Sequence, residues 1–218
     1  MQIVAIQCAG SKNPGAGTLR GGDGRPVRFV ASPKDAPAAA GVLYATPDDL
    51  AADGRSWREH LREYNETDAT NHLRLLTAGS LYIPPLYRNL VERLGTSRVF
   101  ILSAGWGLIR SDFLTPGYDI TFSAQAPLYA RRRSGDRYDD FRMLGPGVPG
   151  DEVHFFGGAD YLPHFARLTS DFRGRRIAYF KSRAVKRPRG LEMVFYETKL
   201  VTNWHYDAAA KFLKNASI

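Results

Sequence analysis

The sequence predicts an α/β protein of three layers, in which helices cover both faces of a mostly parallel central sheet. Short apolar runs rich in β-branched and aromatic residues recur along the 218 residues, and segments with helix start and stop signals lie between them. The strongest runs are apolar at consecutive positions, which is typical of strands that are buried on both faces. Strands that alternate with helices in this manner form parallel sheets.

Four apolar runs are predicted to form the main strands, and each is followed at once by small or polar residues. They are residues 3–7 (IVAIQ), 98–103 (RVFILS), 153–156 (VHFF) and 177–180 (IAYF). Residues 27–30 form a weaker run, which we interpret as an edge strand. The glycines that follow the first run disfavour regular structure there and allow close backbone approach to a partner.

Helix signals lie between these runs. Residues 46–49 supply a cap, a proline and two acids in the order of a helix start, and Ser56 with Glu59 forms a capping box. Gly95 is the expected stop of a helix that two prolines open. The remaining helices are expected at residues 73–81, 84–94, 162–168 and 207–213.

We interpret residues 1–218 as one α/β domain, in which the polar and basic segment 129–150 is a flexible excursion. The single cysteine excludes an internal disulfide and a cysteine-rich zinc site, and the five histidines show no metal-ligand spacing, so we expect neither a metal nor a cofactor. No stretch approaches the ~18 apolar residues of a membrane span. The first residues, MQIVAIQCAG, run into a strand without a basic leader, so we expect no signal peptide and a cytoplasmic protein.

The charge of the chain points to a polyanionic partner. The formal net charge is +8, and residues 172–190 contain eight lysines and arginines and no acid. Because this run flanks a predicted strand, it suits contacts with phosphates, although a solvated basic surface is the alternative. The residues expected to contact DNA are Lys12, Arg131, Arg132, Lys181, Arg183, Lys186, Arg187 and Arg189.

A pocket is predicted where the strands end. In an open parallel sheet the carboxyl ends of the strands meet at one edge, and ligands bind there. Glycine and serine also form ordinary turns, and that alternative is favoured for any single strand end taken alone. Cys8 is either a reactive thiol or, more commonly, a small buried residue. The strand-end residues expected to line the pocket are Gln7, Cys8, Ser11, Ser103, Gly105, Gly158 and Asp160.

Residues 103–123 hold the richest concentration of candidate chemistry. Trp106, Tyr118 and Phe122 lie in a stretch too broken by glycine and proline to be a helix. Aromatic side chains in such loops either stack on a base or pack into the core. Asp119 lies between two apolar residues, where an apolar setting tunes a carboxylate.

Three segments, in this order, carry a resemblance to a known group of proteins. They are IQCAGSKN; LYIPPLYRNL followed by RVFILSAGWGLIRSDFLTPGYDITF; and VHFFGGADYL. They resemble small bacterial and phage proteins that are distantly similar to the YaaA peroxide-stress proteins and to a domain of archaeosine synthase, a group similar to the uracil-DNA-glycosylase superfamily. The likeness covers residues 3–162 with a large divergent stretch between. Two departures leave the roles of Cys8 and Lys12 open: the first motif is spread over residues 8–12, and Gly117 replaces the proline of the family's Pro-Tyr-Asp.

The resemblance implies a uracil-DNA-glycosylase-like fold and cleavage of an N-glycosidic bond in DNA. The chain is also similar to phage-defence glycosylases that excise glucosylated hydroxymethylcytosine. Such enzymes flip a nucleotide out of double-stranded DNA and stabilise positive charge at the sugar as the base leaves. Asp119 is assigned to that charge and to orienting water. The residues assigned to walling the base or hydrogen-bonding to it are Trp106, Tyr118, Phe122, Gln7, Ser11 and Asp160.

Three alternatives stay open. Lys12 or Lys181 in a Schiff base would make the enzyme cut the strand, although an exposed lysine is usually protonated and contacts phosphate instead. A non-catalytic DNA-binding protein of the peroxide-stress type would bind duplexes and release no base. An enzyme acting on free nucleotides would use the same pocket without salt-sensitive binding to a polymer. The sequence contains no Walker A, HExxH or GxSxG motif, and no GxGxxG after the first strand.

Overall fold

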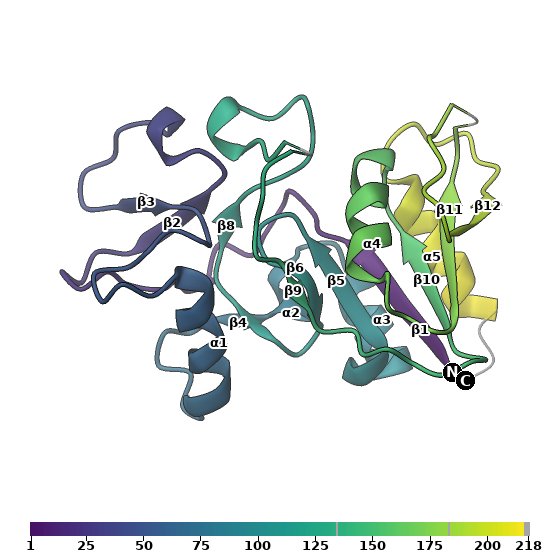
Figure 1. Ribbon diagram of the computed structural model, residues 1–218, viewed down its shortest axis with the longest axis horizontal. Helices are drawn as coiled ribbons and strands as arrows, with labels where there is room; N and C mark the ends of the chain where they lie inside the picture. The colour runs from purple at the N-terminus through teal and green to yellow at the C-terminus, as the bar shows by residue number, and fades with distance from the viewer. Residues whose placement is uncertain (134, 183, 216–218) are drawn as a thin grey trace.

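The computed structural model describes residues 1–133, 135–182 and 184–215. Within these ranges, the centre of the molecule is a seven-stranded sheet (Figure 1). From one edge to the other, its strands are β12 (Glu192–Phe195), β11 (Arg175–Phe180), β10 (Glu152–Phe156), β1 (Gln2–Gln7), β5 (Val99–Ser103), β6 (Gly107–Arg110) and β9 (Phe141–Arg142). The first five are parallel, β6 runs antiparallel to β5, and β9 is parallel to β6. The predicted α/β class with a mostly parallel sheet is confirmed.

The middle strand shows why the sheet forms. The four residues from Ile3 to Ile6 of β1 are all buried, and Val4 pairs with His154 of β10 on one side and with Val99 of β5 on the other. Consecutive apolar residues bury both faces of a strand, and each fully buried large aliphatic side chain contributes about 1.5–3 kcal/mol. The strand is therefore fixed in the core, and its carboxyl end is fixed with it.

Helices cover both faces of this sheet. Phe155 of β10 stacks on Phe165 of α4 (Leu162–Leu168), with ring centroids 4.5 Å apart. The next residue, Phe156, packs against Phe212 of α5 (Trp204–Asn215) at 5.5 Å. Because successive side chains of a strand point to opposite faces, α4 and α5 lie on opposite sides of the sheet. Figure 1 shows the same arrangement, with α4 in front of the strands and α5 behind them.

The helix termini follow the predicted signals in two places. Ser56 Oγ accepts a hydrogen bond from the backbone of Glu59, and the Glu59 carboxylate accepts one from the backbone of Ser56, so the capping box is confirmed. Gly95 ends the helix after the two prolines with a φ of +80°. The helix that Ser56 caps is α1 (Trp57–Thr67), and the helix that Gly95 ends is α3 (Leu86–Leu94). The structure also describes α2 (Ala78–Leu81) and the 3₁₀ turns η1 (Pro33–Asp35), η2 (Thr96–Arg98), η3 (Leu128–Ala130) and η4 (Ala159–Tyr161).

Two predictions of helix were wrong. Residues 46–49 form a turn, in which the Thr46 backbone donates to the Asp49 carboxylate at 2.7 Å. Of residues 73–81, only the last four are helical, because Arg74 has a φ of +54°, which a helix does not accommodate. The preceding β4 (Leu76–Thr77) pairs instead with β7 (Leu114–Thr115) in a two-stranded ribbon.

A smaller parallel sheet lies beside the central one. It consists of β3 (Leu43–Ala45), β2 (Val27–Val30) and β8 (Tyr118–Asp119). The prediction that residues 27–30 form an edge strand was wrong, because β2 pairs on both sides and buries Phe29 completely. This sheet places Asp119 beside Arg28, 91 residues away along the chain.

The described residues of segment 129–150, which we expected to be a flexible excursion, contribute to the fold. The segment contains β9, which forms one edge of the central sheet, and its Arg132 and Asp140 side chains are each 1% exposed. Arg132 donates to both carboxylate oxygens of Asp140 at 2.8 Å. Basic residues in this segment therefore build the interior as well as the surface.

Candidate functional site

A cavity of about 520 Å³ lies beyond the carboxyl ends of β1 and β10. Its walls come from the turn after β1, the chain after β8, the loop after β10 and the start of α5, so both sheets contribute to it. This is the edge at which an open parallel sheet binds ligands. The sequence-predicted residues that line this cavity are Gln7, Cys8, Lys12, Asp119, Gly158 and Asp160.

Gln7, the last residue of β1, has a fixed orientation. Its Oε1 accepts a hydrogen bond of 2.6 Å from the backbone of Gly158 in the loop after β10. With that oxygen engaged, the amide NH₂ is the group left to donate to a ligand. Asp160, exposed in the first turn of η4, adds a carboxylate to the same cavity.

Asp119 lies on β8, at the boundary between the small sheet and the cavity. Arg28 Nη2 donates to its Oδ2 at 2.9 Å, and the Asp119 side chain is 41% exposed. The apolar setting expected from its sequence neighbours was therefore wrong, because the carboxylate faces solvent and a guanidinium. The hydrogen bond with Arg28 engages Oδ2, and no hydrogen bond to Oδ1 is found among the described residues.

Lys12 enters the cavity from the turn after β1. Its Nζ lies 4.2 Å from the ring centroid of Tyr118, in a cation–π contact. Burial lowers the pKa of this lysine, and the nearby Cys8 and Asp119 partly oppose that effect. The expectation of an exposed, phosphate-binding lysine therefore does not describe its surroundings.

A layer of buried hydroxyl groups lies beneath the cavity. Tyr118 Oη is 2.8 Å from Tyr82 Oη and accepts a hydrogen bond of 2.9 Å from Ser103. Burial raises the pKa of both tyrosines well above the ordinary value, so the phenols stay neutral. Ser103 and Gly105, expected on the pocket floor, are thus in the supporting layer below it. Ser11 is exposed nearby and does not line the cavity.

The Cys8 thiol is also part of this support. It is buried, and its Sγ lies 3.4 Å from Tyr161 Oη. Burial raises the pKa of Tyr161 well above its ordinary value. The geometry matches the commoner of the two interpretations of Cys8, a small residue packed at a strand end.

None of the three aromatic residues assigned to the base lines the cavity, and Tyr118 belongs to the buried layer beneath it. Trp106 is completely buried, where its ring meets Phe29 edge-on at 5.0 Å, so the prediction that it stacks on a base was wrong. Phe122 is 9% exposed, and one face of its ring stacks on His164 at 3.9 Å. It packs behind the cavity wall rather than against a ligand.

The residues predicted to contact DNA lie in several separate parts of the structure. Arg132 is paired with Asp140 in the core, so its assignment to DNA was wrong. Lys181 donates to the backbone carbonyl groups of Leu200 and Val201, which leaves one of its three N–H donors for phosphate. Arg183 lies outside the described residues.

Of the remaining cations, Arg131 borders the cavity, because it donates to the carbonyl oxygen of Ala126, a cavity-lining residue, at 2.9 Å. Lys186 and Arg187 are exposed, and the Arg187 guanidinium lies 5.4 Å from the Phe180 ring centroid at the end of β11. Arg189 lies three residues before β12. Because β12 runs parallel to β11, it begins where the parallel strands begin, at the end of the sheet opposite the cavity. Lys186, Arg187, Arg189 and Arg131 remain predicted DNA contacts.

Sequence reasoning missed several residues of the site. Tyr206 of α5 supplies an aromatic wall, and its hydroxyl lies 3.3 Å from that of Tyr87. Polar side chains in the five residues after Ile120 also line the cavity; their place directly after Asp119 was the available signal. The missed lining residues with polar side chains are Thr121, Ser123, Gln125, Tyr161, Asn203 and Tyr206.

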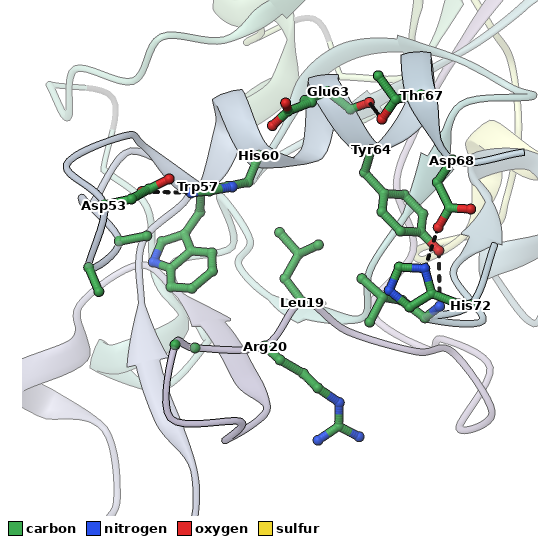
Figure 2. A pocket seen from close by; sticks show the side chains of 15 residues that line it. Leu19, Arg20, Asp53, Trp57, His60, Glu63, Tyr64, Thr67, Asp68 and His72 are labelled. Carbon is green, nitrogen blue, oxygen red and sulfur yellow. Dashed lines mark hydrogen bonds and ion pairs between the residues drawn. The ribbon is translucent and has the colours of Figure 1, made fainter. Parts of the chain in front are cut away.

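A second, larger cavity of about 810 Å³ lies against α1 and contains none of the predicted site residues (Figure 2). Trp57 and Tyr64 form its apolar walls. Its histidines are already engaged, His60 with Asp53 at 3.0 Å and His72 with a neighbouring carboxylate. The 520 Å³ cavity is therefore the better candidate site, because it combines groups with free donors and acceptors at the ligand-binding edge of the sheet.

The described residues contain no helix that combines the length and apolar character needed to cross a bilayer. They also contain no group of three or more His, Cys, Asp or Glu side chains placed to hold a metal ion. Neither protein-family models, nor curated proteins, nor solved structures match this chain.

Proposed function

We propose that the protein is a DNA glycosylase that removes a modified base from double-stranded DNA and leaves an abasic site. The observation that best supports this is the convergence of Asp119, Gln7 and Asp160 on one cavity at the carboxyl edge of the sheet. A carboxylate beside a set of hydrogen-bonding groups is what base excision needs. The proposed relationship to uracil-DNA glycosylases rests on the sequence motifs.

In the proposed reaction, the C1′–N bond breaks and the base leaves with the bonding electrons. Oδ1 of Asp119 stabilises the positive charge that develops on the sugar, while Arg28 holds the carboxylate through Oδ2. A water molecule adds its oxygen to C1′ and loses a proton, which neutralises the departing base. The products are the free base and an abasic sugar, with no oxidant or reductant involved.

The cavity has room for a base that carries a substituent. Its volume of about 520 Å³ is within the ~300–1,000 Å³ typical of ligand pockets. Gln7 offers a donor and Asp160 an acceptor to the flipped base, and Tyr206 walls it in place of Trp106. Together with the sequence resemblance, these features make glucosylated hydroxymethylcytosine the substrate proposed first.

The test is base release from DNA by Asp119→Asn. Wild-type protein and variant are incubated with modified phage DNA and with unmodified DNA; released bases are measured by mass spectrometry and abasic sites by aldehyde labelling. We expect the variant to lose base release and to keep its DNA affinity within a few-fold. The matched control is Asp112→Asn, which removes a carboxylate that pairs with Arg110 and lies outside the cavity. Unchanged turnover by Asp119→Asn would remove its assigned role.

Two outcomes would replace the proposal. Salt-sensitive binding to DNA without released base or abasic sites would identify a DNA-binding protein. Turnover of free nucleotides without binding to a polymer would identify a nucleotide enzyme. A double substitution of Lys186 and Arg187 by alanine is expected to flatten the dependence of log K on log salt by about two units.

A further inference from the structure

Resting on the proposed function, we infer that Lys12 is an amine nucleophile that attacks the abasic sugar and makes the enzyme cut the DNA strand. Nζ of Lys12 lies in the same cavity as Asp119. The one contact found for it in the described residues is the Tyr118 ring, and no carboxylate lies within ion-pair distance. An amine without an ion-pair partner in the described residues, in the same cavity as the proposed catalytic carboxylate, is placed for covalent chemistry.

The backbone that carries Lys12 is held on both sides. Lys12 forms an antiparallel bridge with Tyr82, and the next residue, Asn13, donates to the carbonyl oxygen of Leu81 at 2.8 Å. The Tyr118 ring beneath the amine is fixed in turn by its hydrogen bonds to Tyr82 and Ser103. The amine therefore has a defined position, unlike that of a lysine on the surface.

The surroundings also favour the neutral amine. Burial lowers the pKa of Lys12, which increases the fraction that is unprotonated and nucleophilic near neutral pH. Lys181 is the comparison, because its Nζ donates to two backbone carbonyl groups and lies outside the cavity lining. Of the two lysines considered from the sequence, only Lys12 meets the geometric requirement.

The chemistry balances without a cofactor. After base removal, the ring-opened abasic sugar presents an aldehyde at C1′; the neutral amine adds to it, and the adduct takes up a proton from solvent and loses water to give a protonated Schiff base. The Asp119 carboxylate accepts a proton from C2′, the C–H electrons form a C2′–C3′ double bond, and the 3′ phosphate leaves with the electrons of the C3′–O bond. Water then hydrolyses the Schiff base, which frees Lys12 and an unsaturated aldehyde.

The experiment begins from a duplex that already contains one abasic site, made with an unrelated glycosylase. Borohydride is added with the protein, and covalent protein–DNA adducts are counted on denaturing gels. The wild-type protein is expected to form an adduct, and peptide mass spectrometry is expected to place it on Lys12. Because no base has to be released, a result here is independent of whether the proposed base excision occurs.

Two variants sharpen the test. Lys12→Arg keeps the positive charge and is expected to reduce the adduct at least 100-fold, whereas Lys211→Arg, on the exposed side of α5, is expected to leave it unchanged. Asp119→Asn is expected to keep the adduct and slow strand cleavage. The inference is overturned if the wild-type protein forms no borohydride-dependent adduct, or if mass spectrometry places the adduct on another residue. The mapping uses wild-type protein, so it decides the question even if Lys12→Arg does not fold.

Discussion

Replacing Arg132 by methionine tests whether the interior ion pair holds the fold, as its burial indicates, or serves DNA binding, as the sequence predicted. The Arg132 guanidinium donates to both oxygens of Asp140 and to the carbonyl oxygen of Ala104, each at 2.8 Å. It also lies 3.8 Å from the ring centroid of Tyr138. Methionine has a similar length and no charge, so it removes these hydrogen bonds while filling much of the space.

The expected loss of stability depends on the partner that Asp140 keeps after the substitution. Breaking a buried ion pair on one side usually costs about 3–5 kcal/mol, because the remaining charge stays buried. Asp140 keeps one partner, the 44% exposed Arg167 at 2.5 Å, so the lower end, about 3 kcal/mol, is expected. With a urea m-value of about 3 kcal/mol/M, the unfolding midpoint falls by about 1 M.

The assay is urea unfolding followed by fluorescence and circular dichroism, together with DNA binding at several salt concentrations. Arg133→Met, at the exposed neighbouring arginine, is the control and is expected to change stability by less than about 0.5 kcal/mol. Removing both charges in Arg132→Met/Asp140→Leu is expected to recover part of the loss. If Arg132→Met unfolded at the wild-type urea concentration and instead weakened DNA binding, the structural role given to this arginine would be wrong.

Three further predictions concern the stability of the fold. Ser56→Ala removes the capping box of α1 and is expected to cost about 1 kcal/mol in chemical unfolding; no loss would mean that the cap is dispensable. Gly107→Ala places a Cβ 2.6 Å from the carbonyl oxygen of Phe141 at a φ of +91°, so it is expected to lower the melting temperature much more than Gly150→Ala, where φ is +101° and the space is open; equal losses would show that only backbone strain matters. His205 is 5% exposed, and burial lowers its pKa to about 4. The unfolded chain takes up a proton at this histidine near pH 6.5, whereas the folded chain does not. This group alone is therefore expected to lower the free energy of unfolding by about 2 kcal/mol between pH 7 and pH 5. His205→Phe is expected to remove that part of the pH dependence.

The central strands were predictable because their signal is local. Residues 3–6 are apolar at every position, and only a strand covered on both faces buries them all. The carboxyl ends of such strands must meet at one edge, so the position of the cavity followed from the same pattern. The small sheet was not predictable in this way, because β8 is two residues long and its partner β2 lies far away in the chain.

In the candidate site too, residues with a local sequence signal were predicted, and residues that depend on distant parts of the chain were not. Gln7 ends β1 and Gly158 lies two residues after β10, and both line the cavity as predicted, whereas Trp106 lies three residues after β5 and is completely buried. A tryptophan in a glycine-rich loop gives the same sequence pattern whether it faces a ligand or the core. Arg132 was misassigned because its partner, Asp140, is recognisable only once the chain between them has folded back.

The origin of the cavity walls has a thermodynamic consequence. Gln7 belongs to the seven-stranded sheet, whereas Asp119 belongs to the three-stranded one. A ligand that touches both residues cannot remain bound while the smaller sheet opens, so its binding free energy is added to the cost of that opening. Saturation with such a ligand must therefore slow amide hydrogen exchange in β2 and β8, which belong to a different sheet from the ligand's contact in β1.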